Sequence, residues 1–316
     1  MQPGIPEENE VLNYFKTLSN WNRWGSDDQL GTLNYLSETK TLNAIREVKH
    51  GKTISCARTI SWEPSPDSQI PPVHFMVESG EGWENENKIS NRKSQASTDY
   101  FGLIFHGHTI THMDSLAHFF WNGRAYNNQP SHLVSTSMGA TIESIELAKE
   151  GIITRGILVD IPLLKDIEWL NRGVGVMPED IIEAEKKFDF KIQSGDVLLV
   201  RTGQLHRRNT EGAVDPRVEG STACQAACLP LLHEREISIL GSDTGNDVMP
   251  QQYKALTNPI HQIGIVGMGL WILDNANLEE LAKECKKRKQ WSFLINILPL
   301  RLQNTTGSPV NPIAVF

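Results

Sequence analysis

Cysteine is scarce in this sequence. Only four cysteines occur in 316 residues, and no two of them form a CxxC pair. Cys224 and Cys228 lie four residues apart in a stretch that we expect to be helical, where both are interpreted as small buried hydrophobic side chains. A sequence without a disulfide framework is typical of a reducing compartment, and we expect the protein in the cytoplasm.

Long apolar segments and basic clusters are also missing. No run of about 18 apolar residues is present, so we expect no membrane-spanning helix and no membrane partner. The first ten residues, MQPGIPEENE, are polar and acidic and lack the basic and apolar regions of a secretory signal. The formal net charge is −8 and no basic stripe occurs, which argues against nucleic acid as a partner.

Two common catalytic motifs are absent as well. The chain has no glycine-rich phosphate loop of standard spacing, and the short GMG at 267–269 is not one. The GSDTG at 241–245 does not have the GxSxG spacing of a nucleophile elbow. The sequence therefore gives no indication of a nucleotide-binding loop or of a serine nucleophile.

Hydrophobic periodicity predicts interleaved helices and strands without regular βαβ units. The hydrophobic content of 39% permits a large core, and we find no internal repeat or clear linker, so we expect one domain over 1–316. The segment 61–98 is irregular and rich in proline, glycine and asparagine, and we interpret it as a lid or pocket wall. Helices are expected at 11–24, 38–49, 144–150, 178–187, 222–234 and 278–288, and strands at 53–60, 156–161, 197–203, 236–240 and 291–300.

The stretch 101–123, FGLIFHGHTITHMDSLAHFFWNG, contains an unusual density of metal-binding side chains. Four of the ten histidines lie in it, together with an aspartate, and all five occupy even positions. They are His106, His108, His112, Asp114 and His118. The β-branched residues among them favour a strand, in which His112 and Asp114 project from the same face. Imidazole and carboxylate are the usual ligands of a divalent metal ion, so this pattern indicates a metal-dependent hydrolase.

The same stretch resembles the signature HxGTHxDxPxH of the cyclase family of metal-dependent hydrolases, which includes bacterial kynurenine formamidases and isatin hydrolases. The chain keeps the three histidines, the threonine and the aspartate, but has Ile110 in place of glycine and Leu116 in place of proline. The longer-chain branch of the family is the more similar. Further similar segments are WGSDDQLGTLN, GDVLLVRTG, GSDTGNDVMP, NPIHQ, ILDN and the C-terminal PLRL…TGSPVNPIAVF.

The resemblance implies roles for individual residues. His108, His112 and Asp114 match the family's metal ligands, and His118 matches its catalytic histidine. His261 matches a later histidine of the family. The nearest acid is Asp274, which lies one residue beyond the family's position and is one methylene shorter than its glutamate. Both are implied as residues near the ion, as substrate contacts or weak ligands, or as ligands of a second metal. The implied cofactor is one divalent ion per subunit, zinc or manganese, with iron also compatible with the donors. His106 is expected to be a hydrogen-bonded neighbour that could also reach the metal.

Other residues keep two interpretations. Trp24, Trp62 and Trp121 either form the wall of a substrate pocket or pack in the core. Asp243, also a pocket candidate, and Asp247 either orient a ligand histidine or cap a turn. Arg201 either binds a carboxylate or forms a buried ion pair.

The resemblance implies a swivelling β/β/α-type fold, an α/β arrangement with a mixed sheet, in a homo-oligomer such as a dimer or tetramer. The implied activity is hydrolysis of an amide, lactam, lactone or formamide bond in a small cyclic or aromatic substrate. Two alternatives remain at this point: a metal-dependent cyclase or dehydratase of a small metabolite, and a non-catalytic protein that binds a small molecule or a metal.

Overall fold

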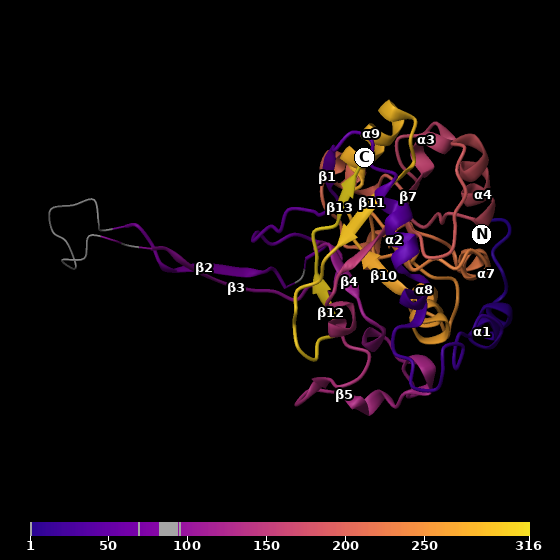
Figure 1. Cartoon of the computed structure of the whole chain (residues 1–316), viewed down its shortest axis with the longest axis horizontal. Coiled ribbons are helices and arrows are strands. Elements are labelled where there is room, and N and C mark those ends of the chain that lie inside the picture. The colour runs from indigo at the N-terminus through magenta and orange to yellow at the C-terminus, as the bar shows by residue number, and fades with distance from the viewer. Residues whose placement is uncertain (1, 69, 82–93, 95) are drawn as a thin grey trace.

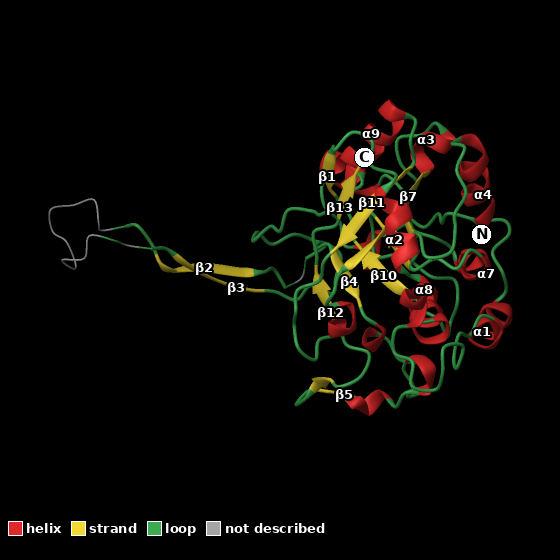
Figure 2. Cartoon of the chain, viewed as in Figure 1, coloured by secondary structure: helices red, strands yellow, loops and turns green. Residues whose placement is uncertain are grey.

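The computed structural model describes residues 2–68, 70–81, 94 and 96–316. Its centre is a curled mixed sheet of nine strands in the order β1-β13-β11-β7-β8-β9-β10-β4-β12 (Figure 2). The pairs β7–β8, β8–β9 and β9–β10 are parallel. On either side of these four strands, β11 pairs with β7 and β4 pairs with β10 in antiparallel orientation. The predicted α/β fold with a mixed sheet is confirmed.

The strands of the large sheet are short except for β7, which has nine residues. They are β1 Thr53–Ser55, β4 His112–Asp114, β7 Ile152–Asp160, β8 Val197–Arg201, β9 Ile239–Ser242, β10 Trp271–Asp274, β11 Ser292–Ile297, β12 Gly307–Pro309 and β13 Ile313–Val315. Strands β8, β9 and β10 are almost wholly buried, which explains why their sequences are continuous apolar runs without alternation. Two further two-stranded sheets pair β2 Val73–Glu78 with β3 Thr98–Gly102 and β5 Val134–Ser135 with β6 Gly139–Ala140.

The α-helices surround this sheet; α2 packs on β7 and β11, and α9 packs on β1 and β7 (Figure 1). Their bounds are α1 Glu8–Thr17, α2 Glu38–Ile45, α3 Ile161–Lys165, α4 Pro178–Lys187, α5 Gln204–Glu211, α6 Pro216–Glu219, α7 Leu229–Glu234, α8 Pro259–His261 and α9 Glu279–Arg288. A π-helix, Gln262–Met268, continues α8. No described helix is both long enough and apolar enough to cross a membrane.

Helices with strong local signals agree with the sequence prediction. The helix α4 has the predicted bounds, with Pro178 at its first position. The Ser37 side chain accepts a hydrogen bond from the Lys40 backbone N–H at 3.1 Å, as expected of an N-cap residue. The prediction of a helix at 222–234 was wrong in its first half. Cys224 forms an isolated β-bridge with Val176, and the α-helix begins only at Leu229.

The segment 61–98 is less irregular than predicted. Strand β2 pairs with β3 in a hairpin that projects far from the body of the protein (Figure 1). The lid interpretation falls partly on residues 69, 82–93 and 95, which lie outside the described part of the chain. The described residues 61–68 remain close to the body, where several of them line cavities.

The histidine-rich stretch forms a strand only in its middle. The residues 103–111 bend and turn, and regular pairing begins at His112. Strand β4 lies between β10 and β12, so the C-terminal tail covers the side of β4 that would otherwise be a sheet edge. This pairing places the central part of the stretch in the buried interior.

Candidate metal centre

Strand β4 positions two of the predicted side chains. His112 and Asp114 are both buried and project from the same face, as the alternation predicted. Across the antiparallel pair β4–β10, His112 lies directly opposite Asp274. Residues that oppose one another in this way present their side chains on the same face of the sheet. The register therefore brings a carboxylate from β10 toward the same point.

Asp114 lies at the centre of a group of imidazoles. Its Oδ1 is 2.9 Å from His106 Nδ1 and 3.4 Å from His112 Nε2. Its Oδ2 is 3.4 Å from His261 Nε2 and 3.9 Å from His118 Nε2. Burial alone would raise the pKa of Asp114, but the surrounding histidines hold it well below its usual range. The carboxylate is therefore an anion surrounded by potential metal ligands.

Two overlapping groups have donor atoms close enough to hold an ion. One consists of His106, His112 and Asp114, and the other of Asp114, His261 and Asp274. Asp114 belongs to both groups. The structure thus brings His112 and Asp114 of β4 together with His261 and Asp274, which lie more than 140 residues further along the sequence.

The buried polar atoms of this centre fit a bound cation. The Asp114 side chain has no exposed surface, and neither of its oxygens has a hydrogen-bond partner among the residues that the structure describes. The same holds for His106 Nδ1, whose close approach to Asp114 lacks hydrogen-bond geometry. A buried carboxylate without donors is costly, and a divalent ion would supply the missing interaction.

The later residues are held in place by hydrogen bonds of their own. His261 Nδ1 lies 2.6 Å from Asp247 Oδ2, and its Nε2 lies 3.5 Å from Asp274 Oδ2. Asn246 donates to Asp274 Oδ1 at 2.7 Å. The interpretation of Asp247 as the residue that orients a histidine agrees with this geometry. Asn246 was not predicted, and its position in the GSDTGND segment gave no specific signal.

His118 lies beside the group on a short 3-10 helix, Leu116–His118. Its ring stacks on that of His106, with centroids 3.7 Å apart. Burial lowers the pKa of His118 to about 4, although Asp114 acts in the opposite direction. Its imidazole is therefore neutral at pH 7 and has a nitrogen available to accept a proton.

The structure does not bring His108 into either metal-binding group; it places His106 there instead. The strand alternation that would align these residues is lost in the bends before His112. His108 faces a neighbouring cavity, which Arg58, Arg172 and Asp243 also line. The ligand role of His108, implied by the resemblance, stays a prediction that metal analysis can test.

The remaining pocket candidates lie in different surroundings. Trp24 packs edge-on against Tyr35, Trp62 stacks on His74, and Trp121 stacks on Phe15. Their pocket roles stay predictions. Asp243 does line a cavity, although its carboxylate accepts hydrogen bonds from the backbone N–H groups of residues 202 and 203.

Arg201 forms ion pairs with the carboxylates of Asp160 and Glu279, both at 2.8 Å. All three side chains are at least four-fifths buried. The geometry agrees with the second of the two interpretations, a buried structural ion pair.

Comparison with known proteins identifies the family. A family model described as "Putative cyclase" matches residues 48–246, more than half of the chain. The chain belongs to this cyclase family. A solved structure titled as that of a novel cyclase is 30% identical to this family member, with a TM-score of 0.86 over 96% of this chain and 99% of that chain.

Solved structures with lower sequence identity share the fold. Isatin hydrolase A from Labrenzia aggregata is 19% identical, with a TM-score of 0.58 over 83% of this chain and 93% of that chain. Isatin hydrolase A from Ralstonia solanacearum is 19% identical, with a TM-score of 0.59 over 84% and 92% of the respective chains. A search of curated proteins finds no match to the sequence.

Proposed function

We propose that this cyclase-family protein is a metal-dependent hydrolase of a C–N or ester bond in a small cyclic or aromatic molecule. The bond is an amide, lactam, lactone or formamide. The observation that carries the proposal is the fully buried Asp114 carboxylate, which has imidazoles around it and forms no hydrogen bond among the described residues. A site built for structure alone would pair such a carboxylate with donors.

We assign one divalent ion per chain to this centre. Ligands at about 2.0–2.2 Å from a single zinc ion lie roughly 3.0–3.6 Å from one another. His112 Nε2 lies 3.4 Å from Asp114 Oδ1 and 3.9 Å from Asp274 Oδ2, and His261 Nε2 lies 3.4 Å from Asp114 Oδ2 and 3.5 Å from Asp274 Oδ2. We place the ion at Asp114, the donor that both groups share, with the other four residues of the two groups as its proposed ligands and zinc or manganese as the metal.

The residues around the ion have separate roles in this proposal. The ion, when bound, supplies a Lewis acid that polarises a carbonyl and lowers the pKa of water. His118, whose Nε2 lies 3.9 Å from Asp114 Oδ2, accepts the proton from the attacking water and returns it to the leaving group. Asp247 keeps the His261 ring oriented, with Nε2 toward Asp114.

A first experiment separates the proposal from its alternatives. Metal content is measured in the purified protein, followed by turnover of N-formyl, lactam and lactone substrates with and without chelator. Chelator-sensitive hydrolysis is the expected result. Metal without turnover across the panel would favour a cyclase, a dehydratase or a binding protein. We favour the enzyme, because His118 beside the proposed ligands has no use in a protein that only binds metal.

We further propose that the protein is a homo-oligomer, a dimer or tetramer, in which the β2–β3 hairpin contacts a second copy. The hairpin extends away from the body (Figure 1). It exposes large apolar side chains. The exposed fraction is about half for Val73, Phe75, Val77, Tyr100 and Phe101, at 54%, 51%, 59%, 51% and 58%. Exposed apolar side chains that lie side by side, such as those of Phe75 and the opposing Tyr100, are typical of a protein interface.

A further inference from the structure

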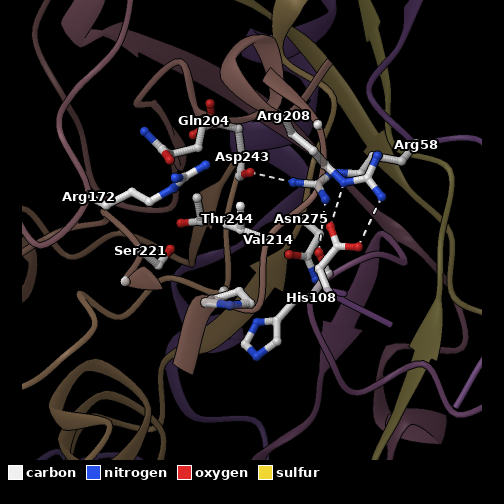
Figure 3. A pocket seen from close by; sticks show the side chains of 15 residues that line it. Arg58, His108, Arg172, Gln204, Arg208, Val214, Ser221, Asp243, Thr244 and Asn275 are labelled. Atoms are coloured by element: carbon white, nitrogen blue, oxygen red, sulfur yellow. Dashed lines mark hydrogen bonds and ion pairs between the residues drawn. The ribbon is translucent and has the colours of Figure 1, made fainter. Parts of the chain in front are cut away.

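A small cavity lies directly beside the candidate metal centre. It holds about 60 Å³ and is lined by residues from several separate segments, among them His108, Gly245 and Asn275 (Figure 3). Gly245 precedes Asn246, and Asn275 follows Asp274, so the cavity shares its wall with the metal-binding group. A side chain at Gly245 would place its Cβ 3.5 Å from Asp274 Oδ2 and 3.6 Å from His108 Nδ1. Because residue 245 is a glycine, no side chain fills the space between the cavity and the Asp274 carboxylate.

Three arginines line this cavity. Arg172 reaches in from one side, and Arg58 and Arg208 lie on the other (Figure 3). The charge of Arg208 is neutralised by Asp67, which it contacts through two hydrogen bonds of 2.5 and 3.0 Å. The other acid in the lining, Asp243, directs its carboxylate to residues 202 and 203.

Arg58 has no carboxylate partner among the described residues. Its Nη1 and Nη2 donate to the backbone oxygens of His108 and Asp243 at 2.9 and 2.5 Å. Its Nε is buried and has no hydrogen-bond partner in the described part of the chain. Burial lowers the pKa of Arg58 to about 10, which reflects a cation that is removed from water without full compensation.

Arg172 is also poorly neutralised. Its side chain is 16% exposed, and its ion-pair partner is Glu211 at 3.9 Å. Glu211 is held more closely by Arg207, at 2.6 Å. The Arg172 charge is therefore available to a ligand in the cavity.

We propose that this cavity binds the carboxylate of an anionic substrate, with Arg172 and Arg58 as the recognising residues. The substrate class is then a small cyclic or aromatic compound that carries a carboxylate in addition to the bond that is hydrolysed. The assignment of this ligand as a substrate rests on the proposed hydrolase function. The binding site itself rests on the arginines alone.

The size and charge of the cavity favour a carboxylate. A volume of about 60 Å³ accommodates a small anionic group. A planar carboxylate matches the fork of a guanidinium, and charge-assisted hydrogen bonds are about twice as strong as neutral ones. His108, which also lines the cavity, contributes a further polar contact to such a ligand.

The test measures binding and needs no turnover. Benzoate and its neutral counterpart benzamide are titrated by calorimetry into the protein as purified, into Arg172→Gln and into the control Arg46→Gln. Arg46 is exposed at the end of α2 and does not line the cavity. Benzoate should bind the wild-type protein and the control equally, and at least about tenfold more weakly to Arg172→Gln. Benzamide should bind weakly to all three.

Two further measurements can overturn the proposal. Treatment with chelator should leave benzoate binding in place, and loss of binding on chelation would assign the carboxylate to the metal instead. Phosphate should bind more weakly than benzoate, and the reverse order would replace carboxylate by phosphate. Unchanged benzoate affinity in Arg172→Gln would show that this cavity is not the carboxylate-binding site. Benzoate binding without hydrolysis of any substrate would contradict the hydrolase while leaving the carboxylate site intact.

Discussion

His261 Nδ1 lies 2.6 Å from Asp247 Oδ2, and the same carboxylate accepts a hydrogen bond from the Ile260 backbone N–H at 2.9 Å. Asp247 therefore fixes both the ring and the backbone that carries it. This hydrogen bond leaves Nε2 of His261 directed at Asp114 and Asp274.

Replacing Asp247 should weaken metal binding without removing a ligand. We expect Asp247→Asn to lower the affinity by about 10- to 100-fold, as for other residues that orient a metal-bound histidine. The measurement is competition with a chelator of known affinity. Asp166→Asn is the control, because Asp166 is exposed and has a left-handed φ of 54° that asparagine tolerates. Equal affinities in both variants would exclude the orienting role.

Two histidine variants decide which residue of the HGH segment is a ligand. We expect His106→Ala to lose bound metal, because His106 Nδ1 approaches Asp114 and has no other partner among the described residues. His108→Ala should keep its metal, since His108 lies in the neighbouring cavity. His112→Ala serves as the reference for loss of both metal and activity. Metal loss in His108→Ala alone would support the ligand set that the resemblance implies.

Removing the imidazole of His118 should separate catalysis from metal binding. His118→Ala is expected to retain about one ion per chain and to lose roughly 10²- to 10⁴-fold in kcat, the usual contribution of a general base. Metal analysis and turnover of the best substrate of the panel are measured on the same preparation. Turnover close to that of the wild-type protein would exclude His118 from the reaction.

Glu143 should make stability depend on pH. Its side chain is buried, neither carboxylate oxygen has a hydrogen-bond partner among the described residues, and burial raises its pKa to about 9. The folded state therefore holds a proton that the unfolded state releases above about pH 4.3, so stability falls as the pH rises toward 9.

The corresponding variant is Glu143→Gln, which imitates the protonated side chain. Its melting temperature should increase relative to the wild-type protein between pH 6 and pH 9, about the range below the raised pKa. Exposed Glu150→Gln is the control and should follow the wild-type curve. Parallel curves for Glu143→Gln and the wild-type protein would show that Glu143 is ionised in the folded state.

The hairpin can be tested by light scattering after size exclusion. Phe75 and Tyr100 oppose one another in the hairpin and stack at 4.8 Å, so they form one apolar face. We expect the double variant Phe75→Ser, Tyr100→Ser to dissociate the oligomer. Leu42→Ser, which changes an equally exposed apolar residue on α2, should leave the mass unchanged. A monomeric wild-type protein would contradict the proposed assembly.

Features with local causes could be predicted from the sequence. The cap at Ser37 and the bounds of α4 follow from residues within one turn, and the shared face of His112 and Asp114 follows from the period of a strand. The place of His106 could not be predicted in this way, because the chain bends between His106 and His112 and the alternation does not continue across the bends.

The arginine-lined cavity shows more clearly which features the sequence alone does not predict. Arg58 follows β1, Arg172 lies in the loop after α3, and Arg208 is on α5. The three arginines belong to no common sequence motif, and nothing in the segment around each of them indicates a binding role. They meet because the order of strands in the sheet brings their segments together, and that order is not encoded in any local pattern.

The pairing of β12 with β4 has a consequence for how the protein is made. Gly307 lies so close to β4 that a Cβ there would come within 2.5 Å of the Met113 oxygen, and Thr306 contacts His106 Nε2 at 2.9 Å. All five proposed ligands leave the ribosome before this tail does. We expect a chain that ends at Asn304 to contain every donor and still to bind no ion, so that metal binding requires residues 305–316 to have been synthesised.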